Sequence, residues 1–182
     1  MTNPAVADHT PNDQVANRPT RRALLGVGVA GAALAVSRTV SAASPGPDLA
    51  GFAISAELAA RDLYDAADGE LWSVMSDSHG AFAERLAGIT GVSASQRNEE
   101  LYSAFSVAFL GSNTSEAALE LENTLAATHS ELLGMIDDET LLAAIASIVA
   151  SESRHAAAIA TTSGADLDTV LVNSAAALSP EA

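Results

Sequence analysis

Residues 147–160 are nearly all small and apolar, but Glu152 and His155 lie in the middle of this segment, three residues apart. On a helix, this spacing places both side chains on one face, where they can bind one metal ion together. Ile148 and Ile159 follow the same helical spacing, so this face is expected to point into a core. The pattern therefore predicts a buried carboxylate and imidazole, the donor types of iron, manganese or zinc sites.

Three further segments carry a carboxylate or an imidazole at an apolar-face position, namely Glu57, His79 and Glu122. Heights along the helix axis can be counted in residues from turns expected near residues 68 and 136. By this count, Glu57 is level with His79, and Glu122 is nearly level with Glu152. The predicted metal ligands are therefore Glu57, His79, Glu122, Glu152 and His155. His129 also lies on an apolar face, but it is about 10 Å along the helix from Glu122. We expect His129 to lie in a different layer and to be a core histidine.

Three buried carboxylates need compensation, because removing an unpaired charge from water costs several kcal/mol. The chain has no Lys, and Arg61 is the only Arg near an apolar face, where it could neutralise one acid. A bound cation is the other way to compensate these charges. Each Glu taken alone is more simply explained as a solvated edge residue, so the prediction depends on the set of five.

The composition restricts the chemistry further. There is no Cys, which excludes thiolate metal sites, iron–sulfur clusters and disulfides. After residue 44, 4 Arg face 21 acidic residues, a formal charge of −17. So acidic a surface disfavours nucleic acid and anionic lipid as partners. No serine has a recognisable base partner, so no catalytic residue is assigned.

The first 43 residues have the pattern of a signal peptide. Arg21 and Arg22 precede an apolar run, residues 23–36, which is followed by small residues at positions 40–43. The run is shorter than the roughly 20 residues of a transmembrane helix. The Arg pair predicts export by the twin-arginine translocase, with no stable membrane anchor after cleavage. An uncleaved anchor is the alternative. The G-x-G-x-x-G at residues 26–31 lacks the strand and acid of a dinucleotide site, so we assign it to the signal.

Glycines and capping residues divide the remainder into predicted helices. Asp48 is expected to cap the first helix, and a short helical piece is expected within the long connection 89–114. Two short-linked hairpins joined by one long crossover between the second and third helices predict an all-α four-helix bundle. The predicted helices span residues 48–67, 70–87, 115–133 and 139–162, and the short piece spans 97–110. The predicted domains are a signal peptide (1–43), the bundle (44–165) and a loosely attached tail (166–182).

Residues 48–162 resemble the bacterial ferritin-like domain family, especially exported actinobacterial members. The resemblance is closest in LENTLAATHSELLG and LLAAIASIVASESRHAAAIA, and looser in HGAFAERLAGITG. It implies a ferritin-like bundle in which two helices each give a Glu and two each give Glu-x-x-His to a di-metal site. Glu57, Glu122, Glu152, His155 and His79 match that pattern, whereas Ser76 stands where the pattern has Glu. The lost carboxylate predicts a single metal ion, or a second one held weakly.

Two functions remain open. The first is an exported ferritin-like protein with a partial di-metal site for one or two ions of iron or manganese and a weak oxidase or peroxide-related role. The second is a metal-free bundle that acts as a structural or binding module outside the cytoplasm. The sequence does not indicate an oligomeric state, and nothing in it favours a storage cage.

Overall fold

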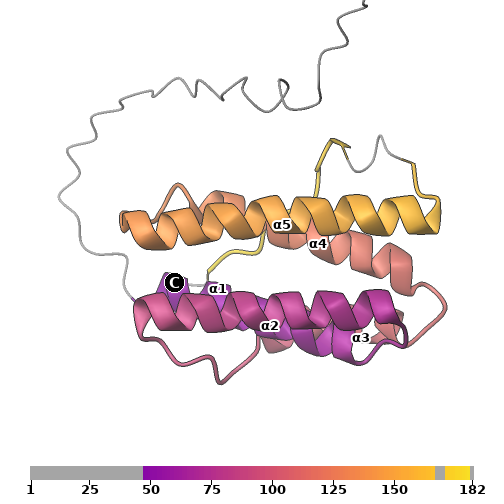
Figure 1. Cartoon of the computed structure of the whole chain (residues 1–182), viewed down its shortest axis with the longest axis horizontal. Coiled ribbons are helices and arrows are strands. Elements are labelled where there is room, and N and C mark those ends of the chain that lie inside the picture. The colour runs from indigo at the N-terminus through magenta and orange to yellow at the C-terminus, as the bar shows by residue number, and fades with distance from the viewer. Residues whose placement is uncertain (1–46, 167–170, 181–182) are drawn as a thin grey trace, which may run out of the picture. The chain divides into compact units, whose positions relative to one another are not determined.

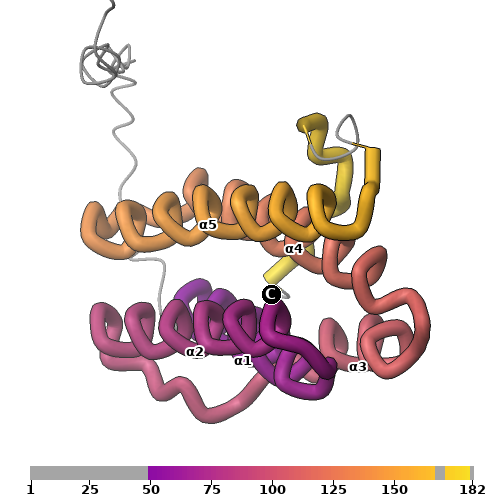
Figure 2. Tube along the Cα trace, turned by 45° about the vertical axis from the view of Figure 1, so that its right-hand side comes forward, coloured from indigo at the N-terminus to yellow at the C-terminus, as the bar shows by residue number. Residues whose placement is uncertain are grey.

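The computed structural model describes residues 47–166 and 171–180, and this part of the chain is all-α (Figure 1). Two antiparallel helix hairpins pack face to face, and a shorter helix lies in the crossover between them (Figure 2). The first hairpin is α1 (Pro47–Asp65) with α2 (Glu70–Thr90), and the second is α4 (Thr114–Leu132) with α5 (Glu139–Ser163). The crossover helix, α3 (Glu99–Phe109), packs against α1 and α4. The all-α four-helix bundle with one long crossover is confirmed.

Local sequence signals explain several of the helix ends. Asp138 and Asn98 cap α5 and α3, each accepting a hydrogen bond from a backbone N–H of the first turn. α2 continues through Gly88 and ends at Gly91, whose φ of 74° is the left-handed conformation that glycine adopts easily. α1 begins at Pro47, so Asp48 lies inside the first turn and is not the cap that we expected.

The hydrophobic core consists of two clusters of buried residues, and each cluster contains residues of all four long helices. The first includes Leu63, Leu121 and Ile159, and the second includes Ile54, Leu132 and Ile148. On each long helix, at least one buried or half-buried acid or histidine lies between residues of the first cluster and residues of the second. The bundle therefore holds a polar layer between two apolar parts of the core.

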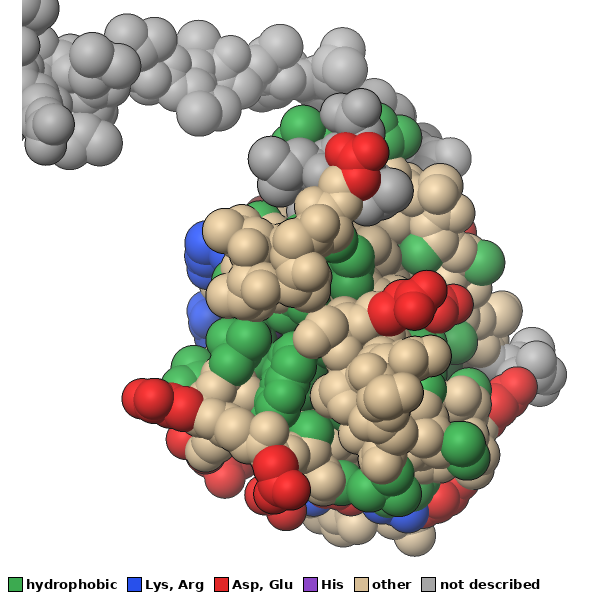
Figure 3. Space-filling view, turned by 90° about the vertical axis from the view of Figure 1, so that its right-hand side faces the viewer, with side chains coloured by type: hydrophobic (Ala, Val, Ile, Leu, Met, Phe, Trp, Pro, Cys, Tyr) green, Lys and Arg blue, Asp and Glu red, His purple; other side chains and the backbone are tan. Residues whose placement is uncertain are grey.

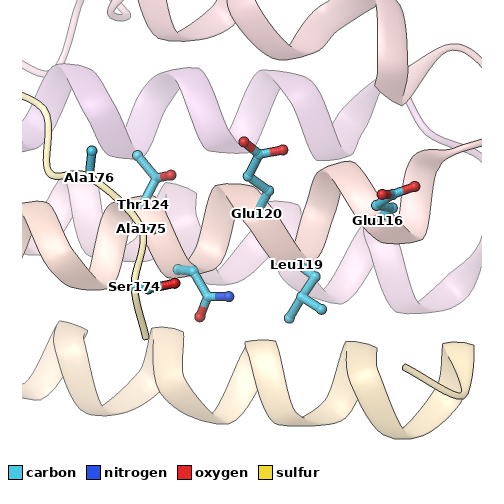
Figure 4. A pocket seen from close by; sticks show the side chains of 8 residues that line it. Glu116, Leu119, Glu120, Thr124, Ser174, Ala175 and Ala176 are labelled. Carbon is cyan, nitrogen blue, oxygen red and sulfur yellow. The ribbon is translucent and has the colours of Figure 1, made fainter. Parts of the chain in front are cut away.

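Residues 171–180 pack against α4. The Asn173 side-chain amide donates to the Asn123 carbonyl, and the Leu178 backbone N–H donates to Thr128 Oγ1 at 2.9 Å. Leu178 also packs against the first hydrophobic cluster. Figure 4 shows the segment passing beside Thr124 and lining a surface pocket of about 430 Å³ with α4. The described part of the tail is thus attached, contrary to the expectation of a loose tail.

The predicted signal peptide, with Arg21 and Arg22, lies outside the described residues. Within 47–166 and 171–180, no helix combines the length and the apolar character needed to cross a bilayer. The face shown in Figure 3 exposes acidic side chains and scattered hydrophobic groups, in keeping with the acidic composition.

Candidate metal centre

Six ionisable side chains lie together between the two hairpins. The Glu57, Glu122 and Glu152 carboxylates and the His79 and His129 rings are fully buried, whereas the His155 side chain is 15% exposed. They include every histidine of the described residues. The five residues predicted from the sequence are therefore brought into one region, together with a sixth, His129.

The first group of donors is His79, Glu122 and His155, from α2, α4 and α5. His79 Nε2 lies 3.1 Å from Glu122 Oε1, and His155 Nδ1 lies 3.4 Å from Glu122 Oε2. Tyr64 of α1 donates its hydroxyl to Glu122 Oε1 at 2.6 Å. The Tyr64 ring also stacks on the His79 ring, with 5.4 Å between centroids. Glu122 is thus held from two sides, and one of its oxygens faces His155.

The second group is Glu57, His129 and Glu152, from α1, α4 and α5. His129 Nδ1 lies 2.7 Å from Glu152 Oε1, and His129 Nε2 lies 3.5 Å from Glu57 Oε1. The two groups adjoin, because the other oxygen of Glu57, Oε2, lies 2.6 Å from His79 Nδ1. In each group, one donor atom of each residue lies within 4.8 Å of the others.

The buried charges shift the proton equilibria strongly. Burial alone lowers the pKa of His79, but the Glu122 and Glu57 carboxylates outweigh it and raise the pKa well above its usual value. For His129, the effect of Glu152 likewise outweighs burial and raises the pKa to about 9. Burial raises the pKa of Glu122, but His79 and His155 outweigh this and lower it to about 2. Without metal, protonated histidines therefore neutralise much of the carboxylate charge.

Burial also raises the pKa values of Glu152 and Tyr64. Burial raises the pKa of Glu152, and the opposing charge of His129 does not cancel this shift. Burial, together with the Glu122 charge, raises the pKa of the Tyr64 hydroxyl well above its usual value. Tyr64 therefore remains a neutral hydrogen-bond donor to Glu122 at physiological pH.

Polar atoms without a partner indicate what the region can bind. Five buried donor atoms make no hydrogen bond: Glu57 Oε1, Glu122 Oε2, His129 Nε2, Glu152 Oε2 and His155 Nδ1. Two pairs of them are separated by 3.4 and 3.5 Å. Two atoms that bind one cation at about 2.1 Å each lie at most about 4.2 Å apart, so each of these pairs is close enough to share an ion. The residues present therefore fit a metal ion of the kind that takes carboxylate and imidazole ligands.

His129 belongs to the cluster, which corrects its assignment as a separate core histidine. It shares no donor group with Glu122, as its distance along α4 predicts, but it shares one with Glu152, which was expected to be level with Glu122. The contacts of His129 with Glu152 and of Glu122 with His155 place the midpoint of this hairpin near residues 138–141. The sequence pattern predicts this turn near residue 136 instead. Because the helices are antiparallel, an error of a few residues in the midpoint shifts the paired residues by twice that number. This shift is about 10 Å along the helix axis.

Two further expectations change. Arg61 binds Asp62 with its guanidinium, 2.6 Å from Oδ1, and its side chain is 43% exposed, so it does not neutralise the cluster. Glu152 and His155 both join the cluster but fall in different donor groups, so they do not form one shared pair. Sequence reasoning also missed Tyr64, although it lies seven residues after Glu57 and hence on the same face of α1.

Fold and donor set together define a four-helix bundle with a carboxylate–histidine centre in its core. A family model for the ferritin-like domain matches residues 41–165. This covers more than half of the chain, and the chain belongs to the ferritin-like domain family. No curated protein and no solved structure matches it.

Proposed function

We propose that this protein is an exported ferritin-like metalloprotein that binds iron or manganese between its two helix hairpins. The observation that carries the proposal is a set of five buried ligand atoms that make no hydrogen bond, four of which face one another in two carboxylate–imidazole pairs at 3.4 and 3.5 Å. They come from α1, α4 and α5 around His79 of α2. Leaving such atoms unsatisfied costs about 1–3 kcal/mol each, and more when the group is charged. Cations bound in the two donor groups would satisfy these atoms without new protein contacts.

Each residue has a defined part in this proposal. Glu57, Glu122 and Glu152 supply anionic oxygens, and His129 and His155 each keep one ring nitrogen without a hydrogen bond. The Tyr64 hydroxyl fixes the Glu122 carboxylate. His79, whose two ring nitrogens face Glu57 and Glu122, is a further donor. Bound iron or manganese would supply one-electron chemistry with oxygen or peroxide, and a weak oxidase or peroxide-removing role is the activity that we propose.

The experiment is elemental analysis of the mature protein, purified after native export. We expect about one or two ions of iron or manganese per chain. Glu122→Gln removes a buried anionic donor and should lower the metal content. Glu120→Gln, two residues away on α4 but exposed, is the matched control and should leave the content unchanged. Metal near zero in the wild-type protein would reject the proposal.

A second candidate function is a metal-free structural or binding module outside the cytoplasm. It is favoured by the short contacts that already join opposite charges, namely 2.6 Å for His79–Glu57 and 2.7 Å for His129–Glu152. With both histidines protonated, these pairs offset most of the buried negative charge. Elemental analysis decides between the two functions, because the second requires no bound metal.

A further inference from the structure

Ser76, the residue that replaces the expected carboxylate, does not take part in the cluster. Its hydroxyl donates to the Arg61 carbonyl of α1 at 3.1 Å. The side chain is therefore engaged with a neighbouring backbone, and it belongs to neither group of donors. The cluster nevertheless has six potential donor residues, because His129 enters it from α4.

The surroundings of His129 are those of a metal-binding imidazole. Its Nδ1 lies 2.7 Å from Glu152 Oε1, and its Nε2 has no hydrogen-bond partner and lies 3.5 Å from Glu57 Oε1. The second oxygen of Glu152, Oε2, is buried and unpartnered as well.

We propose that His129 replaces the missing carboxylate as the sixth donor, so that the cluster holds two cations in two unequal sites. This inference rests on the proposed metal-binding function. The O-rich site is Glu57, His129 and Glu152, and the N-rich site is His79, Glu122 and His155. Without His129, the O-rich site would keep only two donors and would hold a cation poorly.

Charge makes the two sites unequal. A divalent cation in the O-rich site meets two carboxylates and is neutralised, whereas in the N-rich site it meets one and leaves a net charge of +1. Uncompensated charge in a core is costly, so the O-rich site should bind first and more tightly. Carboxylates also favour manganese, whereas imidazoles favour zinc, so we expect Mn²⁺ to prefer the O-rich site.

The test is a Mn²⁺ titration of metal-free, full-length protein, followed by calorimetry and by metal content after gel filtration. The wild-type protein should bind two Mn²⁺ ions per chain with different affinities. His129→Gln should weaken the tighter site by at least about 10-fold and leave the weaker site. His155→Ala should remove the weaker site and leave the tighter one.

Thr128→Val is the matched control, because Thr128 is buried beside His129 but donates no atom to either group. It should bind two ions as the wild type does, and circular dichroism should show each variant folded. Two ions bound to His129→Gln with the affinities of the wild type would overturn the role of His129. No Mn²⁺, iron or other metal bound to any variant would instead reject the proposed function itself.

Discussion

His129 Nδ1 and Glu152 Oε1 lie 2.7 Å apart, fully buried, and join α4 to α5 across the second hairpin. The contact has two consequences. It leaves His129 Nε2 without a hydrogen bond, 3.5 Å from Glu57 Oε1. It also makes the stability of the metal-free protein depend on pH.

The pKa of His129 rises from 6.5 to about 9 in the folded state. The folded protein therefore holds a proton that the unfolded chain loses above pH 6.5. The resulting stabilisation is complete below about pH 6.5, and it is lost as the pH rises through about 9. We expect the free energy of unfolding in urea to fall by up to roughly 3 kcal/mol over this range.

The double variant His129→Gln/Glu152→Gln removes both members of this pair. Its free energy of unfolding should therefore fall clearly less over the same pH range. Some pH dependence should remain, because His79 also has a raised pKa. If the free energy of unfolding fell equally with pH in the variant and the wild type, both measured without metal, the pH dependence would not come from the His129–Glu152 pair.

Tyr64→Phe removes the hydroxyl that donates to Glu122 Oε1 at 2.6 Å. Because the acceptor is a buried carboxylate, we expect a loss of about 1.5–3 kcal/mol in the free energy of unfolding. Tyr102→Phe is the matched control, since the Tyr102 ring packs under the Arg97 guanidinium and lies outside the cluster. Equal effects of the two substitutions would show that the Tyr64–Glu122 bond contributes nothing specific.

Ser76→Ala should leave the metal content unchanged, since the Ser76 hydroxyl donates to the Arg61 carbonyl of α1. We expect only the loss of one half-buried hydrogen bond, about 1 kcal/mol in the free energy of unfolding. Elemental analysis and thermal unfolding measure the two quantities on the same sample. A loss of metal would place Ser76 among the ligands.

Replacing Arg21 and Arg22 with Lys should retain the precursor in the cytoplasm, because the adjacent pair is the signature of twin-arginine export. Arg18→Lys lies outside the pair and should be exported normally. Fractionation and N-terminal sequencing check this, with the mature N-terminus expected near residues 43–44. Unchanged export of the double variant would refute the assigned route.

The fold could be predicted largely because its boundaries are encoded locally. Gly134 and Gly164 follow the ends of α4 and α5, and Asp138 caps α5. Helical spacing also identified the buried faces, and the short linker between α1 and α2 placed Glu57 level with His79. These features depend only on residues that are close in the sequence, so regular helix geometry is enough to predict them.

The contacts across the second hairpin could not be predicted in the same way. The segment between Leu132 and Glu139 is long enough to shift the register of α5 along α4, and its length alone does not fix the shift. Consequently His129 was assigned as a separate core histidine. The partners of Arg61 and Ser76, an adjacent Asp and a backbone carbonyl, depend on side-chain directions that spacing alone does not determine.

The polar layer between the two apolar parts of the core also determines how the helices align. If α5 slid by one turn along α4, Glu152 would leave His129 and enter an aliphatic environment, at a cost of several kcal/mol. The same penalty applies to Glu57 on α1 and Glu122 on α4. The layer thus selects one axial alignment from several that the Ala-rich helix surfaces would otherwise accept. Because this selection operates with or without a bound ion, a lineage that lost its metal would still be under pressure to keep these residues.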